Sequence, residues 1–366
     1  MSDQTPYYVA FSYMLGIGPV HFAQLMQRFG DPKSAYQATT KDLYKILGRN
    51  LAEKFDTFRK KCIPHSIVKY LLTKNVQILH QGSSYYPKKL VHIPDPPICL
   101  YLRGNINILH EHPDDFIAIV GTRKPSSYGK ETTRQCVKLL CEYDYTIISG
   151  MALGIDSIAH SCALDNGGKT IAVLGCGIEV VYPHQNTHLF KRILDCNGAV
   201  ISEFPPPMTT MKGLFVSRNR IVSGLSKAVI VVEGTEKSGT LITARYAAEQ
   251  GRDVFAIPGE INSPLSRAPN LLIKNGATII TSPQDILESY NTEIKSHVRK
   301  TILNSVDAHE KMVLEQLIRE SSYIDTIART VNMPIPHITS ILTSLEIKGF
   351  IAKNDKGEYY ITNGYT

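Results

Sequence analysis

Short runs of apolar, mostly β-branched residues alternate with longer segments of helical spacing between residues 115 and 283. The apolar runs are Phe116–Val120, Thr146–Ser149, Thr170–Leu174, Ala199–Ser202, Ala228–Val232, Val254–Ile257 and Thr278–Ile280. The segments between them include Lys130–Glu142, Ile155–Leu164, His188–Leu194 and Leu241–Gln250. Continuous apolar runs are typical of strands buried on both faces, as in parallel sheets. The alternation therefore predicts an α/β domain with a doubly wound, mostly parallel sheet.

The pattern before this domain is first helical and then irregular. Residues 7–61 show the apolar spacing of short amphipathic helices, with a tight L-G-I-G-P turn at 15–19. This turn has the form of a helix-hairpin-helix motif, which binds phosphate through backbone N–H groups; a purely structural hairpin is the alternative. Residues 83–113 hold several prolines around the apolar run Ile98–Leu102 and are predicted to be a loop-like approach to the α/β domain.

The spacing near the end of the chain is typical of a winged helix. Helices are predicted over Glu310–Arg319, Ile324–Thr330 and Pro336–Gly349, followed by strands over 350–353 and 359–362. A polar stretch precedes them. The predicted organisation is a helical domain over 1–82, an α/β domain over 83–290, a linker over 291–304 and a winged helix over 305–366.

Composition narrows the class of protein. The 366 residues are 43% hydrophobic and 20% charged, which is globular rather than disordered. No apolar run reaches the roughly 18 residues that span a bilayer, and residues 1–15 lack the pattern of a secretory signal. The seven cysteines include no C-x-x-C spacing, which disfavours structural zinc and a disulfide scaffold. We therefore expect a cytoplasmic protein with no metal, no cofactor and no membrane partner.

The net charge of +7 is unevenly distributed. Residues 1–113 carry 14 Lys and Arg against 7 Asp and Glu, whereas residues 114–290 carry 17 of each. An anion site in the middle domain must therefore depend on local geometry rather than on an overall field. Residues 300–366 carry 7 against 8, although a DNA-reading winged helix is normally basic. We expect this last domain to contact protein or to pack on its neighbour.

Ligands of doubly wound sheets bind beyond the carboxyl ends of the strands. The first predicted strand is followed by Gly121, Thr122, Arg123 and Lys124, and then by a helix. Glycines, a hydroxyl, a helix N-terminus and two cations together predict a phosphate cradle. It is neither G-x-G-x-x-G nor a loop ending in G-K-[ST], so the anion need not belong to a nucleotide cofactor. A surface turn with solvated charges is the alternative.

The next two strand ends offer weaker candidates. Ser149 and Gly150 follow the second strand, and Asp156 is expected to cap the helix after them. His160 is expected to be a packed structural residue, with a catalytic base as the alternative. Cys176, between two glycines after the third strand, resembles an exposed nucleophile but has no assignable His–acid partner.

The fourth strand leads through three prolines into a basic and aromatic loop. Its candidate residues are Lys212, Phe215, Arg218, Asn219 and Arg220. Cations that hold phosphates and a ring that stacks on bases suit single-stranded nucleic acid, at about 1–3 kcal/mol per stacked base. Alternatively, one of the two arginines pairs with an acid at the sheet edge, Glu203 or Glu233.

A second candidate cradle follows the fifth strand, where Ser238, Gly239 and Thr240 begin a helix. Two cradles at one edge suit successive phosphates of a nucleic-acid chain. They equally suit one small nucleotide, and Glu233 or Asp156 would then be the acid of a nucleotide-hydrolysing enzyme. A nicotinamide dehydrogenase is disfavoured because G-x-G-x-x-G and an acidic ribose partner are missing.

Nine motif blocks cover about 160 residues of the α/β region. They are V-G-T-R-K-P-S-S-Y-G (120–129), S-G-M-A-L-G-I-D-S-I-A-H (149–160), G-G-K-T-I-A-V-L-G-C-G (167–177), Y-P-H-Q-N (182–186), S-E-F-P-P (202–206), R-N-R-I-V-S-G-L-S (218–226), S-G-T-L-I-T-A (238–244), G-R-D-V-F-A-I-P-G (251–259) and N-L-L-I-K-N-G-A (270–277). In content and order they resemble the DNA-processing protein A family (DprA, also called Smf). The glycine-containing hairpin and the winged helix look like the family's flanking domains.

The resemblance implies an extended Rossmann-like domain that binds single-stranded DNA without sequence preference, preceded by a small helical domain of the SAM or helix-hairpin-helix kind. It further implies a protein that loads the RecA recombinase onto incoming DNA during natural transformation. Such proteins form homodimers through the same domain and are not enzymes. By position, the anion-site arginine is Arg123, and the basic–aromatic segment is Lys212 and Phe215 with R-N-R at 218–220.

Three positions depart from the family pattern. Val216 stands where the family commonly has the proline of F-P-x-R-N-R, and Ala268 replaces the glycine of a G-x-N. Both changes alter the expected shape of a turn. His184 stands in a loop where relatives often carry a lysine, which predicts a weaker or more pH-dependent DNA contact there.

Overall fold

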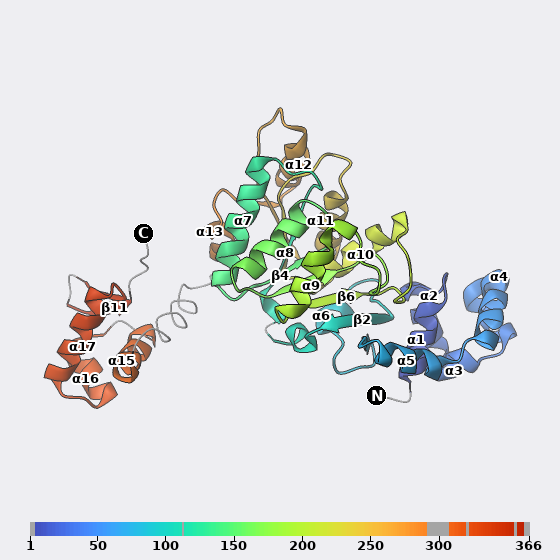
Figure 1. Ribbon diagram of the computed structural model, residues 1–366, viewed down its shortest axis with the longest axis horizontal. Helices are drawn as coiled ribbons and strands as arrows, with labels where there is room; N and C mark the ends of the chain where they lie inside the picture. The colour runs from blue at the N-terminus through green and yellow to red at the C-terminus, as the bar shows by residue number, and fades with distance from the viewer. Residues whose placement is uncertain (1–3, 112, 291–306, 320–321, 355–356, 362–366) are drawn as a thin grey trace. The chain divides into compact units, whose positions relative to one another are not determined.

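The chain divides into two compact units, residues 1–283 and 284–366. Figure 1 shows the computed structural model, which describes residues 4–111, 113–290, 307–319, 322–354 and 357–361. The predicted linker over 291–304 falls outside these ranges. Within them, no helix is both long enough and apolar enough to cross a membrane.

A nine-stranded sheet forms the centre of the first unit (Figure 1), in the order β1-β2-β6-β5-β4-β3-β7-β8-β9. The strands are β1 (Gln77–His80), β2 (Cys99–Gly104), β3 (Phe116–Val120), β4 (Thr146–Ser149), β5 (Thr170–Val173), β6 (Ala199–Ser202), β7 (Ala228–Val231), β8 (Asp253–Ala256) and β9 (Thr278–Ile279). Strands β3 to β9 pair in parallel, and β1 and β2 are antiparallel. The predicted doubly wound, mostly parallel sheet is confirmed, with every predicted strand within a residue of its expected ends.

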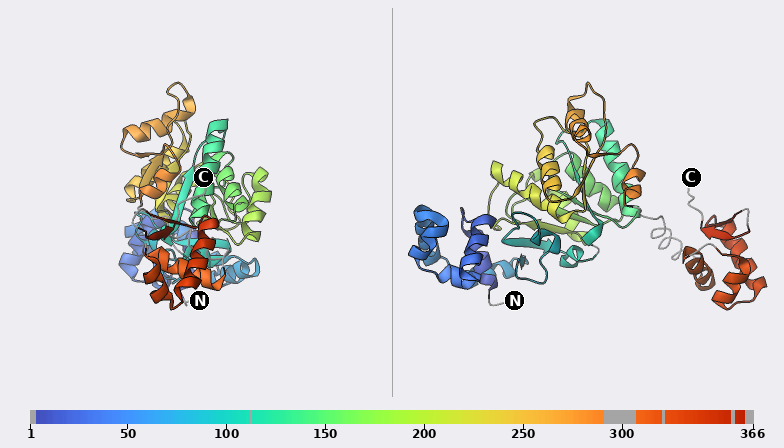
Figure 2. Two further views of the ribbon diagram at one scale, coloured as in Figure 1. Left: turned by 90° about the vertical axis from the view of Figure 1, so that its left-hand side faces the viewer. Right: turned by 180° about the vertical axis from the view of Figure 1, so that it is seen from behind.

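Helices cover both faces of this sheet (Figure 2). They are α7 (Ser127–Glu142), α8 (Ile155–Asp165), α9 (Thr187–Asp195), α10 (Lys212–Leu225), α11 (Gly239–Glu249) and α12 (Arg267–Lys274). Helices α8 and α9 contribute to one hydrophobic core cluster, and α10 and α11 to another. Strands β3 to β7 are buried at every position, which explains their continuous apolar sequences.

The direction of winding reverses at β3. The chain moves from β3 through β4 and β5 to β6, and then returns through α10 to β7 on the other side of β3. Because crossovers of this kind are right-handed, the loops after β3 and β7 start side by side but lead to opposite faces. This reversal is the place where doubly wound sheets bind ligands.

Five helices precede the sheet: α1 (Thr5–Tyr13), α2 (Pro19–Phe29), α3 (Pro32–Gln37), α4 (Thr40–Lys61) and α5 (Pro64–Thr73). The predicted turn between α1 and α2 forms, with Gly16 at a φ of 101° and Pro19 as the first helical residue. Such a φ favours glycine. The ring of Phe11 lies between those of Phe22 and Phe55, at centroid distances of 5.4 and 5.2 Å.

The segment over 83–113 is more ordered than its prolines suggest. Its apolar run forms β2, which pairs antiparallel with both β1 and β6, after the short helix α6 (Lys88–Val91). The loop prediction is therefore wrong for residues 99–104. Local sequence shows only an isolated apolar run there, and its pairing partner β6 lies about a hundred residues later.

The second unit contains the predicted winged helix. Its elements are α13 (Gln284–Glu288), α15 (Ala308–Arg319), α16 (Ile324–Val331), α17 (Ile335–Ile347), β10 (Ile351–Lys353) and β11 (Tyr359–Ile361). The two strands pair antiparallel, and Leu314, Ile327, Ile338 and Leu345 belong to one buried core. Residue 362, the expected end of the last strand, lies outside the described residues.

Two buried histidines should make the stability of the first unit depend on pH. His80 and His160 are 3% and 0% exposed, and burial lowers their pKa from 6.5 to about 4 and about 3. Below pH 6.5 both histidines take up protons in the unfolded chain but not in the folded chain. The free energy of unfolding therefore decreases as the pH is lowered. Between pH 7 and pH 5 we expect a loss of about 2 kcal/mol per histidine.

Urea unfolding at these two pH values measures this loss. The His160→Gln variant should lose about half as much as the parent, because one of the two sites no longer titrates. Equal losses in the parent and the variant would show that His160 does not contribute.

Candidate nucleic-acid interface

Five loops meet where the parallel strands β3 to β7 end, because the carboxyl ends of parallel strands lie at one edge. All sequence-predicted site residues belong to these loops, to the strand end at Ser149, or to the helices that follow. The structure therefore brings the candidates to one edge of the sheet. It also shows that several of them are occupied by contacts within the protein.

Glu233, two residues after β7, occupies the N-terminal end of α7. Its carboxylate accepts hydrogen bonds from the backbone nitrogen (3.0 Å) and the hydroxyl (2.5 Å) of Ser126, the N-cap of α7. Its backbone oxygen accepts one from the nitrogen of Thr122 at 2.8 Å. A Cβ on Gly129 would lie 2.3 Å from the carboxylate. An internal anion thus fills the helix N-terminus that the sequence assigns to a phosphate.

A second internal carboxylate, that of Asp156, lies in the first turn of α8. The carboxylate of Asp156 accepts hydrogen bonds from the backbone nitrogens of Gly150 (3.2 Å) and Ala152 (3.3 Å). Asp156 is 6% exposed, and burial raises its pKa while the charge of Arg218 opposes the rise. The N-cap is Gly154. Asp156 lies in the first turn of α8 as expected, but the expectation that its side chain caps this helix is wrong, because it bonds the preceding loop.

Arg218 is buried beneath that loop, with 5% exposure. Its guanidinium donates hydrogen bonds to the backbone oxygens of Gly150, at 2.5 Å, and Val173. A Cβ on Gly150 would lie 2.4 Å from the guanidinium nitrogens. Arg218 therefore connects α10 to the ends of β4 and β5, and its hydrogen-bonding groups face the protein.

Arg220 is 2% exposed and pairs with Glu203 through two bonds of 2.7 Å. Its Nε lies 2.9 Å from a carboxylate oxygen of Asp95. Burial lowers the pKa of Arg220, but the two carboxylates outweigh this effect and raise it. The alternative in which one arginine pairs with an acid at the sheet edge is thus the arrangement of Arg220. Asp95 was missed because it lies far away in the sequence.

The basic–aromatic segment is a helix rather than the loop that the sequence suggests. Helix α10 begins at Lys212, has no side-chain cap and carries no acidic residue in its first turn. Phe215 packs against Gly175, where a Cβ would lie 2.6 Å from its ring. The rings of Phe215 and Tyr182 are 5.5 Å apart. The start of α10 thus lies beside the loop after β5.

The start of α11 is the third helix terminus at this edge. The hydroxyl of Ser238 accepts hydrogen bonds from the backbone nitrogen (3.3 Å) and the hydroxyl (2.9 Å) of Thr240. Gly239 is exposed, and the first turn holds no acidic residue. The Asn219 side-chain nitrogen donates to the Gly239 oxygen at 3.5 Å, so α10 lies against the start of α11.

Exposure divides the predicted site residues into three groups. The exposed ones are Arg123, Lys124 and Gly239, the half-buried ones are Gly121, Thr122, Gly150, Phe215, Asn219 and Ser238, and the buried ones are Ser149, Arg218, Arg220 and Thr240. The side chain of Lys212 lies outside the part of the chain that the structure describes. Neither Arg123 nor Lys124 forms an ion pair with any residue that the structure describes, so both are available to an external anion.

The candidates for catalysis are engaged in the interior. Cys176 is 1% exposed, burial raises its pKa to about 11, and its thiol donates to the oxygen of Val180 at 3.2 Å. It is therefore protonated near neutral pH and is a poor nucleophile. His160 bonds the hydroxyl of Thr170 at 2.6 Å, as expected of a structural residue. In the described part of the chain, no group of three or more His, Cys, Asp or Glu residues suits a metal ion.

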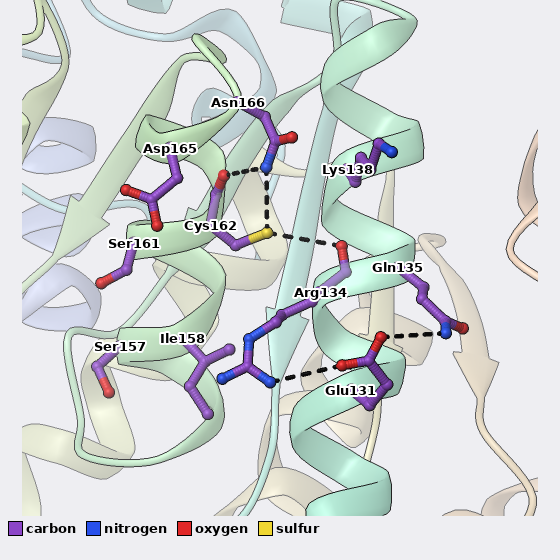
Figure 3. A pocket seen from close by; sticks show the side chains of 10 residues that line it. All are labelled: Glu131, Arg134, Gln135, Lys138, Ser157, Ile158, Ser161, Cys162, Asp165 and Asn166. Atoms are coloured by element: carbon purple, nitrogen blue, oxygen red, sulfur yellow. Dashed lines mark hydrogen bonds and ion pairs between the residues drawn. The ribbon is translucent and has the colours of Figure 1, made fainter.

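A pocket of about 470 Å³ lies between α7 and α8 (Figure 3). Its polar groups largely pair with one another: Arg134 lies 3.6 Å from Glu131, and the amide of Asn166 donates to the backbone oxygen of Cys162 at 2.7 Å. Both cations and acids line it. The pocket therefore offers no concentrated charge and contains none of the sequence-predicted site residues.

The fold and this edge define a Rossmann-like α/β protein with helical and winged-helix extensions and with exposed cations at the edge where doubly wound sheets bind ligands. The family model described as DNA recombination-mediator protein A matches residues 77–291. The model described as DprA winged helix domain matches residues 299–355. This chain belongs to the DprA/Smf family.

Several relatives and solved structures are similar over most of the chain. Protein Smf of Escherichia coli is 37% identical over 310 residues, which cover 82% of this chain and 81% of that protein. DNA processing protein DprA of Bacillus subtilis is 38% identical over 252 residues, covering 69% and 82%. The X-ray structure of DprA from Streptococcus pneumoniae superposes with a TM-score of 0.67 at 32% identity, covering 79% and 98%.

A structure of DNA processing protein A from Helicobacter pylori is described by its single-stranded DNA binding mode. It superposes with a TM-score of 0.52 at 32% identity, covering 60% of this chain and 96% of that one.

The contacts of Arg220 predict a structural rather than a ligand-binding phenotype. Arg220→Met should lower the free energy of unfolding by about 3–5 kcal/mol, because it leaves the carboxylate of Glu203 buried and unpaired. Arg123→Ala, at an exposed position, should change it by less than about 0.5 kcal/mol. Urea unfolding of both variants measures the contrast. If Arg220→Met were as stable as the parent but no longer bound DNA, Arg220 would instead be a residue that contacts the ligand.

Proposed function

We propose that this protein binds single-stranded DNA without sequence preference and loads the RecA recombinase onto incoming DNA during natural transformation, in the cytoplasm. The observation that carries the proposal is the exposed pair Arg123 and Lys124 at the reversal point of the sheet, which forms no ion pair with any described residue. Membership of the DprA/Smf family and the Helicobacter pylori relative described by its DNA binding mode support it.

The loop that carries these cations is held from two sides. The nitrogen of Thr122 donates to the Glu233 oxygen, and the nitrogen of Ile155 donates to the Thr122 oxygen at 3.2 Å. Gly154 approaches so closely that a Cβ there would lie 2.4 Å from the Thr122 oxygen. A backbone fixed in this way loses little conformational freedom on binding, which favours affinity.

The cations and backbone N–H groups at this edge suit contact with the backbone of a nucleic acid rather than with its bases. Cations and backbone N–H groups bind phosphates, which carry no sequence information. Half-buried Phe215 beside exposed Tyr182 offers aromatic surface, and stacking on aromatic rings tolerates every base. These features support binding without sequence preference. Lys212, the first residue of α10, remains part of the proposed contact surface.

We further propose that two copies associate through the α/β domain. Strand β9 ends the sheet, and an edge strand has an unpaired side. Ile261, Leu271 and Ile279 are 90%, 41% and 44% exposed in the segments around it. Apolar groups next to an open strand edge support pairing with a second copy.

The alternative function is hydrolysis or binding of a small nucleotide. This function needs a catalytic acid, and the candidates are Glu233 and Asp156, which are 5% and 6% exposed. Each carboxylate accepts two hydrogen bonds from the loops that it holds. An acid in this position needs a rearrangement before it reaches a substrate, so we favour the DNA-binding function.

Removing the exposed arginine should weaken binding to every sequence alike. Arg123→Ala should raise the Kd for labelled oligo(dT), oligo(dA) and mixed single strands about tenfold, because one phosphate contact is lost. The slope of log affinity against log salt should fall by roughly 0.7. Fluorescence anisotropy at two salt concentrations measures both.

The matched control is Arg134→Ala, which removes another exposed cation, on α7 away from the sheet edge. It should bind like the parent protein. Parent-like binding by Arg123→Ala would show that the assigned edge is wrong, and a loss confined to one base composition would contradict backbone recognition.

The winged helix should contribute little to single-strand affinity. The exposed side chains of α17 include Ile335, Thr339, Thr343 and Ile347 rather than cations. Lys348, just after this helix, bonds the buried carboxylate of Glu310 at 2.6 and 2.8 Å. Deleting residues 300–366 should therefore change the Kd for oligo(dT) by less than about fivefold. A loss of an order of magnitude would show that the winged helix binds DNA.

A further inference from the structure

An apolar groove of about 630 Å³ lies on the N-terminal helices of the first unit. Its walls are the end of α1, the end of α4, the outer side of α5, and Pro207 from the proline-rich loop after β6. This groove is separate from the loops after β3 and β7 that carry the proposed DNA contacts. It is therefore a surface that the proposed function does not use.

Apolar side chains in the groove are exposed to an unusual degree. Ile63 is 66% exposed and Tyr70 is 45% exposed, and Ile67 between them is half-buried. The spacing 63, 67, 70 places Ile67 and Tyr70 on one side of α5, in line with Ile63 just before its first residue. Phe58 and Cys62 at the end of α4 complete an apolar floor. An exposed stripe of this kind marks an interaction surface.

Lys61 is the charged residue in the groove lining, and the segment of chain that forms most of the groove is basic. Residues 54–74 hold six Lys and Arg against a single acid, Asp56. Asp56 is already paired with Arg59 and Lys60, both at 2.7 Å. Lys61, which lines the groove, and Lys69 are exposed and form no ion pair with any described residue. Glu179, whose charge contributes to the raised pKa of Tyr13, lies 3.7 Å from Arg103. The side chains in and beside the groove that are not ion-paired with a described residue therefore carry a net positive charge.

We propose that this groove docks an acidic peptide segment of a partner protein, whose aliphatic or aromatic side chains enter the groove while its carboxylates meet Lys61 and Lys69. Apolar anchors in a groove with complementary charge at the rim are the usual chemistry of peptide recognition. The inference goes beyond the proposed DNA binding and does not depend on it.

The same observations disfavour single-stranded DNA as the occupant. Stacked bases need open ring faces in sequence along a cationic path. Here Lys74 already lies over the ring of Tyr70, at 5.7 Å from its centroid, and the ring of Phe58 stacks on Phe55 at 6.4 Å. The remaining lining includes the aliphatic side chains of Ile63, Ile67 and Pro207, which suit apolar side chains of a peptide.

The test uses the full chain and a fluorescein-labelled peptide of roughly twelve residues that alternates pairs of Asp or Glu with pairs of Leu or Phe. Anisotropy should show binding with a Kd in the micromolar range. Ile63→Glu and Lys61→Glu should each weaken it about tenfold or more, one by blocking the apolar floor and the other by reversing the rim charge. A peptide with Ser in place of Leu and Phe should not bind.

Matched controls lie on the same two helices outside the groove. Leu72→Glu on α5 and Lys54→Glu on α4 are exposed and should change the Kd by less than about twofold. Arg123→Ala should bind the peptide like the parent, so failure of the DNA assignment is distinguishable from failure of this one.

Three results would overturn the docking proposal. The first is absence of peptide binding up to about 1 mM. The second is an equal loss of affinity in the control variants and the groove variants. The third is displacement of the peptide by oligo(dT) together with weaker oligo(dT) binding by Ile63→Glu, which would assign the groove to nucleic acid.

Discussion

The carboxylate of Glu233 joins the two loops that begin where the sheet reverses its winding. It bonds the backbone nitrogen and hydroxyl of Ser126, and so places a negative charge at the N-terminus of α7. In a doubly wound sheet this crevice would otherwise be open to a ligand. With the inner position filled, the side chains left exposed at this place are those of Arg123 and Lys124, on which the proposed DNA contact rests.

Helix α10 contributes two buried cations that complete this framework. Arg218 bonds the ends of β4 and β5, whereas Arg220 pairs with Glu203 and Asp95. Buried charges are tolerated when hydrogen bonds and opposite charges compensate their lost hydration. The R-N-R motif thus supplies structural arginines, and it leaves Asn219 between α10 and α11 as its half-buried member.

The distribution of charge separates two kinds of contact on one unit. The α/β region has no net charge between residues 114 and 290, so the proposed binding of a polyanion depends on the local arrangement of exposed cations rather than on an overall field. The basic excess lies before residue 114, where Lys61, which forms no ion pair with any described residue, lines an apolar groove. An elongated phosphate chain suits the first arrangement, and an acidic peptide with apolar side chains suits the second.

Local pattern alone determined the parallel strands, the glycine turn at residues 15–19 and the winged helix, because periodic burial and backbone propensity are properties of short segments. The same pattern predicted that the candidate residues lie at one edge of the sheet, because the carboxyl ends of parallel strands lie at one edge. Only the tertiary structure decided which segments and side chains meet. Strand β2 pairs with β6, about a hundred residues later, and the carboxylate of Glu233 bonds the N-terminus of α7, about a hundred residues earlier. Burial and pairing of charged groups depend on contacts between segments far apart in the chain, and those contacts exist only after folding.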